Sequence, residues 1–289
     1  MSRLVIALMW LARFLPLGLL AALGNAAGAA GFWLIPERRR VARVNLARCF
    51  PGMEPVARER LARAHFRAFA RGFLEHGLLW WSSPGRIART VRLEGLEHLR
   101  ALRGQPAILL MPHFVGLDAA VTRLSCEVDV AGIYARQKDP LYERLLARGR
   151  NRFGRTRLIS RQDGVRAALR AIRDGYPFCY LPDLDFGPRD SIFVPFFGVQ
   201  AATVTGASRL ARLTGAKVLP FVARMLPGSG GYVATIHAPW ADFPSDDVAA
   251  DTRRVNAFIE RRVLEMPEQY FWLHKRFKTR PPGEARFYD

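Results

Sequence analysis

The hydrophobic positions divide the chain into an apolar N-terminal stretch, a long helical stripe and a region of short alternating runs. Residues 4–35 are almost continuously apolar, with Arg13 as the only charge and Pro16 as a potential kink. This stretch is longer than the roughly 20 residues that a helix needs to cross a bilayer. It predicts a membrane anchor over residues 1–40, which either spans the membrane or lies kinked in its interface.

A cleaved signal peptide is an alternative interpretation, because "NAAGAAG" resembles a small-residue cleavage site. However, the apolar run is broken, few positive residues precede it, and the cluster "ERRR" at residues 37–40 follows it directly. Positive residues beside a membrane segment favour the cytoplasmic side. The pattern therefore favours an uncleaved anchor whose basic flank lies against anionic lipid headgroups.

Residues 41–289 have the patterns of a second unit, an α/β domain. Apolar residues recur at three- and four-residue steps through residues 55–81, which predicts a long amphipathic helix. Farther along, short apolar runs alternate with helical patterns. The predicted strands are 106–112, 176–182, 216–225 and 231–239, and the predicted helices are 163–175, 202–214 and 247–265. This alternation predicts a central mixed or mostly parallel sheet flanked by helices.

The charge balance indicates an anionic partner. The chain has 44 Lys and Arg against 25 Asp and Glu, a formal charge of +19. Such a surface attracts nucleic acid, phospholipid headgroups, a phosphorylated substrate or an acidic carrier protein, and an Arg-rich composition alone also produces it. The three cysteines have no metal-type spacing. They predict reduced thiols rather than disulfides.

A histidine and an aspartate follow one of the predicted strands. In "LLMPHFVGLD", residues 109–118, His113 comes directly after an apolar run and Asp118 comes five positions later. In open α/β sheets, ligands bind beyond the carboxyl ends of the strands. If residues 114–117 turn, with Gly116 making the turn easy, the carboxylate can orient the ring so that His113 acts as a general base. On spacing alone, an ordinary structural pair remains the alternative.

Two further clusters contain candidate functional residues. The segment "PDLDFGPRD", residues 182–190, places Asp183, Asp185 and Arg189 after another predicted strand. These residues suit an ion-pair network better than a metal site, so we expect no metal. The Arg-rich stretch 134–154 contains Arg136 and Arg150, which suit phosphate recognition, although most such stretches are solvated helix faces. No nucleotide-binding loop and no G-x-S-x-G nucleophile elbow occurs.

The sequence resembles the late acyltransferases of lipid A biosynthesis, within the wider group of glycerolipid-type acyltransferases marked by His-x4-Asp/Glu. The segments that carry the resemblance are "HFVGLD", "PDLDFGPRDSIFVPFFG", "TGASRLARLTGAKVLPFV" and "PEQYFWLHKRFKTRP". With the N-terminal stretch, the similarity covers essentially the whole chain. One departure is Asp118, because Glu is common at this position in the family.

The resemblance implies a reaction and roles for named residues. It implies transfer of an acyl chain from acyl carrier protein to a hydroxyl of a phosphorylated, Kdo-bearing glycolipid, at the cytoplasmic face of the bacterial inner membrane and without a cofactor. His113 is then the general base and Asp118 its orienting partner. Arg150 and Asp183 match functionally important family positions, with Arg150 holding an anionic part of a substrate. Arg136, Asp185 and Arg189 are weaker substrate-binding candidates.

Two other functions remain as alternatives. The same chemistry serves an acyltransferase that acts on another glycolipid or a lysophospholipid. A non-catalytic basic protein that binds membranes or nucleic acid explains the charge, but it leaves the His-x4-Asp motif and the "PDLDFGPRD" segment unexplained. The resemblance therefore predicts anionic membrane lipids, a phosphorylated acceptor and acyl carrier protein as partners, with no nucleic acid among them.

Overall fold

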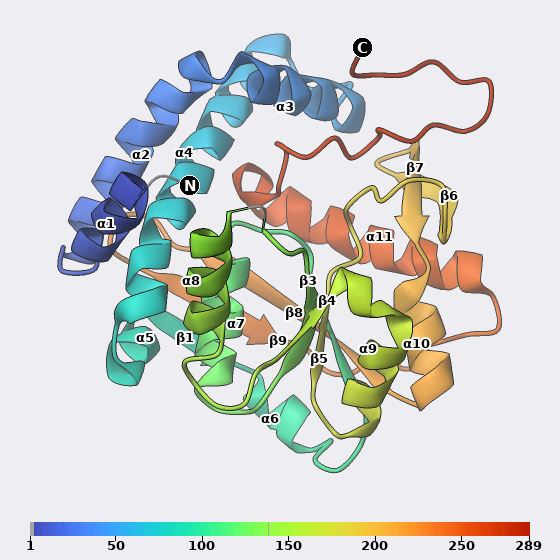
Figure 1. Cartoon of the computed structure of the whole chain (residues 1–289). Helices are drawn as coiled ribbons and strands as arrows, with labels where there is room; N and C mark the ends of the chain where they lie inside the picture. The colour runs from blue at the N-terminus through green and yellow to red at the C-terminus, as the bar shows by residue number, and fades with distance from the viewer. Residues whose placement is uncertain (1–2, 138) are drawn as a thin grey trace.

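A seven-stranded sheet runs through the middle of the molecule in the residues that the computed structural model describes, 3–137 and 139–289 (Figure 1). The strand order is β1-β9-β8-β2-β5-β3-β4, and only the β8–β9 pair is antiparallel among these described strands. The strands are β1 (Val91–Glu94), β2 (Ala107–Leu110), β3 (Ala131–Tyr134), β4 (Arg157–Ser160), β5 (Phe178–Tyr180), β8 (Lys217–Met225) and β9 (Tyr232–Ile236). The prediction of a mostly parallel sheet is confirmed.

The sheet is buried on both faces, which explains why β2 and β5 at its centre are apolar at every position. In β2, Ile108 and Leu110 belong to one core cluster, whereas Leu109 belongs to the other. The first face is covered by α9 (Gly164–Arg173), α10 (Gly206–Thr214) and α11 (Val248–Glu265). The second face is covered by α5 (Pro84–Thr90), α7 (Leu117–Ser125), α8 (Pro140–Arg150) and the end of α4 (Pro55–Trp81).

Among these elements the sequence predicted β2, β5, β8, β9, α4, α9, α10 and α11, and α4 has the bounds expected for it, whereas α5, α7 and α8 were not predicted. The helix predicted over 202–214 begins only at Gly206, because residues 199–204 form β7 (Val199–Val204). This strand pairs with β6 (Ser191–Phe196) in a hairpin outside the main sheet. The strands β1, β3 and β4 were not predicted, since each has four residues and little apolar periodicity.

The N-terminal residues form three helices, α1 (Arg3–Ala12), α2 (Leu17–Leu34) and α3 (Pro36–Cys49). The chain turns at Pro16, so α1 and α2 are not one continuous span. In the described residues, α2 is the one helix long and apolar enough to cross a membrane, with a mean hydropathy of 1.5. It lies along α4 (Figure 1), where Phe32 packs edge-on against Phe66.

The opposite side of the N-terminal helices is exposed and apolar. Only 28% of α2 is buried in the fold. We call the exposed residues of this region the apolar crest: Leu8, Trp10, Leu11, Phe14, Leu19, Leu23, Trp33, Leu34 and Ile35. The predicted boundary between the membrane anchor, residues 1–40, and the acyltransferase domain, residues 41–289, falls inside α3. The division of the chain into these two parts stays a prediction.

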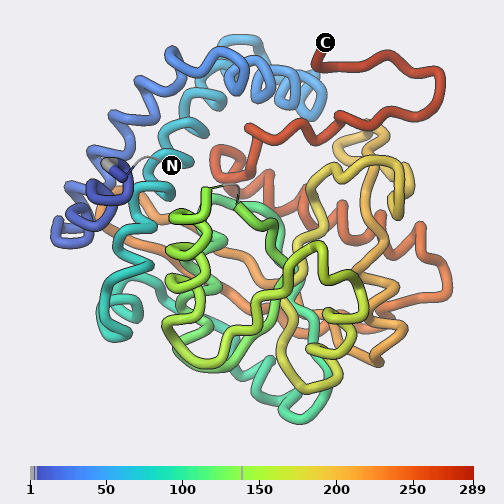
Figure 2. The backbone as a smooth tube through the Cα atoms, in the orientation of Figure 1, coloured from blue at the N-terminus to red at the C-terminus, as the bar shows by residue number. Residues whose placement is uncertain are grey.

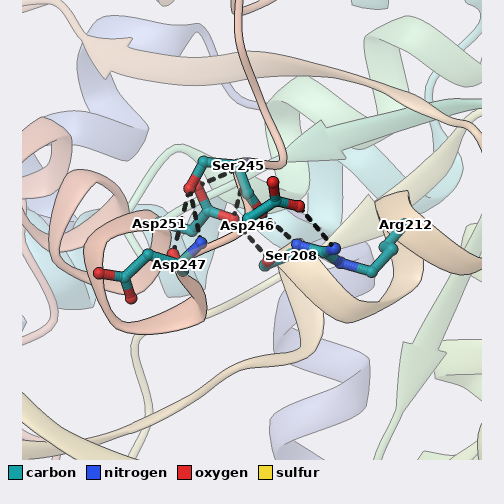
Figure 3. Close-up of polar contacts among 6 residues, drawn as sticks. All are labelled: Ser208, Arg212, Ser245, Asp246, Asp247 and Asp251. Carbon is teal, nitrogen blue, oxygen red and sulfur yellow. Dashed lines mark hydrogen bonds and ion pairs between the residues drawn. The ribbon is translucent and has the colours of Figure 1, made fainter.

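Two sets of contacts fix the C-terminal part of the chain. The last residues run beside α3 (Figure 2), where Arg48 stacks on Phe287 and the Asn45 amide donates to the Trp272 carbonyl at 2.8 Å. Figure 3 shows the second set, in which buried Asp251 accepts from the Ser208 hydroxyl at 2.6 Å. This contact joins α10 to α11 on the face of the sheet that α10 and α11 cover.

Candidate active site

His113 and Asp183 meet beyond the carboxyl edge of the sheet. The Nδ1 atom of His113 lies 2.7 Å from Oδ1 of Asp183, and the backbone N–H of His113 donates to Oδ2 at 2.9 Å. The Asp183 side chain is 1% exposed, whereas that of His113 is 19% exposed. Because a carboxylate only accepts, Nδ1 carries the ring proton and Nε2 is free to take another.

The sheet register places these two residues together. Leu110 of β2 pairs with Tyr180 of β5 in parallel, and each of the two residues lies three positions beyond that pair. The segments "LLMPH" and "CYLPD" therefore leave neighbouring strands in step. Burial favours the neutral acid and raises the pKa of Asp183, but the charge and hydrogen bonds of His113 outweigh it, so the pKa lies below its ordinary value.

The predicted contact between His113 and Asp118 is wrong, because the carboxylate that binds the His113 ring is Asp183. Residues 115–116 do turn, but α7 begins at Leu117, and Asp118 lies in its first turn. From there its carboxylate faces α4 and α8. Gly116 serves close packing rather than an unusual backbone angle, since its φ is −84° and an added Cβ atom would lie 2.8 Å from Cβ of Ala223.

Asp118 instead forms a cluster with His76 of α4 and Arg150 of α8, which we call the Asp118 triplet. Oδ2 of Asp118 lies 3.0 Å from Nε2 of His76, and Oδ1 accepts from Arg150 at 2.7 Å. Gly149 allows α8 to approach α4 this closely, because an added Cβ atom would lie 2.7 Å from the Trp80 ring. The expected importance of Arg150 thus has a structural basis in its contact with Asp118.

The charges in this triplet reinforce one another. Burial raises the pKa of Asp118, but the Arg150 charge and the His76 hydrogen bond together hold it far below its ordinary value. The charge of Asp118 raises the pKa of Arg150 in turn. Burial lowers the pKa of His76, and the hydrogen bond and charge of Asp118 outweigh this effect and raise it. Asp118 is therefore ionised and held between two basic groups.

An apolar pocket of about 180 Å³ lies between the two sets of residues. His113, His76 and Asp118 contribute to its wall. The remaining lining residues are Phe69, Gly72, Phe73, Phe114, Val115, Leu117 and Phe271. The pocket therefore combines a candidate base and a charged group with walls that accommodate hydrocarbon.

The C-terminal segment "PEQYFWLHKRFKTRP" holds the turn that follows His113. The backbone N–H of Phe271 donates to the His113 carbonyl at 3.0 Å, and that of Val115 donates to the Gln269 carbonyl at 2.9 Å. Phe271 also reaches the pocket, and its ring centroid lies 6.2 Å from that of His113. The segment that carries much of the family resemblance thus positions the candidate base.

Arg150 and Asp183 each contact a residue that lines this pocket, whereas the lining itself contains none of the predicted substrate-binding residues. Asp185 is buried, and its carboxylate accepts from the Thr279 backbone at 2.6 Å and from the Gly187 backbone at 2.9 Å, which fixes the loop after β5. We assign it a structural role. Arg136 and Arg189 are exposed, and their part in substrate binding stays a prediction.

Sequence reasoning missed His76 and the pairing of His113 with Asp183. His76 belongs to the apolar stripe of residues 55–81, where it stands between Phe73 and Trp80 as a polar exception. That exception was the available signal for His76. The matching segments "LLMPH" and "CYLPD", each an apolar run followed by proline and a titratable residue, were the signal for the pair.

This geometry agrees with the comparison to known families. Residues 1–279 match the family model described as "Bacterial lipid A biosynthesis acyltransferase". The chain belongs to this family. This lipid A acyltransferase therefore carries the His-x4-Asp motif in a fold whose candidate base is oriented from a neighbouring strand.

Curated relatives are similar over nearly the whole acyltransferase chain. The lipid A biosynthesis lauroyltransferase of Escherichia coli (strain K12) is 35% identical, with 96% of this chain and 91% of that protein covered. The palmitoleoyltransferase of the same organism is 31% identical, with 97% and 92% covered. The myristoyltransferase is 32% identical, with 93% and 83% covered. Because these relatives are named for different acyl chains at nearly equal identity, similarity does not select the acyl chain that this enzyme transfers.

Proposed function

We propose that this lipid A acyltransferase moves an acyl chain from the thioester of acyl carrier protein to a hydroxyl of a Kdo-bearing lipid A precursor. The contact between His113 and buried Asp183 beside an apolar pocket carries the proposal. A base with one free ring nitrogen suits proton abstraction from a hydroxyl. The pocket suits the hydrocarbon next to the thioester.

The reaction proceeds by direct attack. Nε2 of His113 takes the proton of the acceptor hydroxyl as its oxygen bonds to the thioester carbonyl carbon. The tetrahedral intermediate then collapses, the C–S bond breaks, and the thiol leaves with the proton that His113 returns. Asp183 holds the ring in the required tautomer and stabilises the imidazolium that forms, and such a positioned base supplies about 10²- to 10⁴-fold in rate.

The positive charge of the protein supports anionic substrates. Acyl carrier protein is acidic and the acceptor is phosphorylated, and the chain has a formal charge of +19. Beside the pocket, one guanidinium nitrogen of Arg150 donates a hydrogen bond to Asp118. A guanidinium has further N–H donors, and we assign these to an anionic group of a substrate.

The apolar crest supports association with the inner membrane from its cytoplasmic side. Exposed large apolar side chains on α1 and α2 are costly in water and favourable in hydrocarbon. Arg38, Arg39 and Arg40 lie at the start of α3, where each guanidinium donates to a backbone carbonyl and adds positive charge that attracts anionic headgroups. Such an anchor would hold the active site beside its acceptor, because the acceptor is itself a membrane lipid.

The test is an assay with purified protein in detergent or lipid. Acyl carrier proteins that carry lauroyl, myristoyl or palmitoleoyl chains are offered with a Kdo-bearing lipid A precursor, and product mass is measured. We expect one acyl group to be added by the native protein and none by His113→Ala. The matched control is His98→Ala, on α6 (Leu96–Arg100) at the opposite edge of the sheet, which should retain activity. Equal product from the native protein and His113→Ala would show that His113 is not the base.

A further inference from the structure

His76 lies against a backbone carbonyl oxygen and a carboxyl oxygen. Its Nδ1 atom is 2.9 Å from the Gly72 carbonyl oxygen, and its Nε2 atom is 3.0 Å from Oδ2 of Asp118. A neutral imidazole has one N–H group and therefore satisfies one of these acceptors. With a neutral ring, two lone pairs would face each other at the second contact.

The remaining way to satisfy both contacts is a protonated Asp118 that donates to a neutral ring. Arg150 opposes this state, since its guanidinium donates to the other carboxylate oxygen at 2.7 Å and favours the ionised form. An imidazolium with two N–H donors satisfies both contacts and keeps Asp118 ionised. The geometry therefore favours a positively charged His76.

We propose that His76 is a positioning residue, held as an imidazolium, which fixes the Asp118 carboxylate at the pocket wall and leaves the Asp118 triplet with a net positive charge. The proposal rests on the proposed function for its reaction. His76 acts through Asp118, because both of its ring nitrogens are occupied by protein oxygens.

The charge matters because of where the triplet lies. His76 and Asp118 line the same pocket as His113, where a thioester carbonyl oxygen becomes negative during the attack. The triplet contains two cations and one anion while His76 is protonated. Loss of that proton neutralises the triplet and leaves one of the two His76 contacts without a donor. We therefore expect activity to fall as His76 deprotonates.

The groups that face His76 come from three parts of the fold. Asp118 approaches from α7 and Arg150 from α8, and their opposing effects on the His76 pKa leave it raised after burial is included. The Tyr142 ring of α8 packs at a tilt against Trp80, and His113 lies on the pocket wall. The pH at which His76 loses its proton therefore depends on both Asp118, which raises the His76 pKa, and Arg150, which lowers it.

The first experiment reads the charge directly, without acyl transfer. Protein labelled with ¹⁵N in its histidine rings is titrated by NMR, and the His76 signals are assigned from their loss in His76→Gln. At neutral pH we expect both ring nitrogens of His76 to be protonated. A neutral tautomer there overturns the proposal. If His76→Gln does not fold, the spectrum of His76→Lys supplies the assignment because it lacks the same signals.

The second experiment uses pH profiles of kcat/KM. In the native enzyme we expect an alkaline fall that coincides with the His76 titration seen by NMR. His76→Gln should be at least about tenfold less active at neutral pH and lack this fall, because it donates to Asp118 without a charge. His76→Lys keeps a cation and should retain activity to higher pH than the native enzyme. An alkaline fall that is unchanged in both variants overturns the proposal.

A matched control is available on the same helix. His65 is buried, its Nδ1 atom faces the Glu268 carbonyl at 2.9 Å, and burial lowers its pKa to about 4. His65→Gln should therefore leave the alkaline fall in place. If NMR shows the His76 imidazolium but no acyl transfer is found with any donor, the proposed function fails and the charge assignment stands.

Discussion

Replacing Asp183 with asparagine tests the orientation of the candidate base. The amide keeps the size of the side chain, and its oxygen can still accept from the His113 backbone. Its NH₂ group would then face Nδ1 of His113, which lies 2.7 Å from the native carboxylate. Two donors cannot share that contact, so the ring moves its proton to Nε2. The nitrogen that should accept the substrate proton is then occupied.

The loss can be estimated from the contacts that change. A hydrogen bond to a charged group contributes about 1.5–3 kcal/mol, and the imidazolium that forms in the reaction also loses its buried counter-charge. Together these effects suggest about 3–5 kcal/mol of transition-state stabilisation. At about 1.4 kcal/mol per factor of ten, kcat falls by roughly 10²- to 10⁴-fold.

The assay combines single-turnover acyl transfer with ¹⁵N NMR of the His113 ring. Asp183→Asn should transfer slowly and show the proton on Nε2. Asp118→Asn should leave the His113 proton on Nδ1, because Asp118 contacts His76 and Arg150 instead. The reasoning is refuted if Asp183→Asn reacts within about fivefold of the native rate, or if the ring changes tautomer only in Asp118→Asn.

The same variant makes a prediction about pH and stability. Because the pKa of Asp183 is lowered in the fold, its charge stabilises the native state above the ordinary pKa of about 3.9. That contribution disappears as the pH falls through the folded pKa. The difference in unfolding free energy between the native protein and Asp183→Asn should therefore be largest near neutral pH and shrink below pH ~4, as measured by urea titration.

Three other substitutions test packing and membrane association. Gly116→Ala should cost about 1–3 kcal/mol in urea unfolding, because its Cβ atom meets Ala223, whereas Gly85→Ala has room and should be neutral or stabilising. Asp185→Asn should lower the unfolding free energy by about 1–3 kcal/mol with kcat and KM unchanged; a tenfold rise in KM for the acceptor would indicate substrate contact. Phe14→Glu with Trp33→Glu should weaken vesicle flotation roughly 10²- to 10⁴-fold, and unchanged flotation would contradict the membrane assignment.

The sequence predicted the strands on both sides of the site, but not their adjacency. The runs that became β2 and β5 are recognisable because both faces of each strand are buried, and such strands are apolar throughout. Their order in the sheet depends on how the intervening helices pack, which no local pattern contains. Without the strand order, a partner for His113 could be chosen only among carboxylates that are near it in the sequence. The sequence therefore paired it with Asp118, although Asp183 lies on the neighbouring strand.

The same reasoning explains why His76 was missed. Periodicity predicted α4 correctly, since a stripe of apolar residues is a local property of the chain. Which part of the stripe lies over the sheet, and which over α2, is decided by long-range packing. His76 can be recognised as a candidate site residue only when α7 brings Asp118 and α8 brings Arg150 to the same turn of α4.

The helix α4 contacts both the N-terminal helices and the pocket at the candidate active site. Along one side it packs against α2, the helix that carries much of the apolar crest. Near its carboxyl end, Phe69, Phe73 and His76 form part of the pocket that contains His113. A helix shared in this way fixes the distance and direction between the apolar crest and the candidate base. We therefore propose that the N-terminal helices form a wall of the enzyme rather than a detachable tether, because displacing α2 exposes the helix on which the pocket is built.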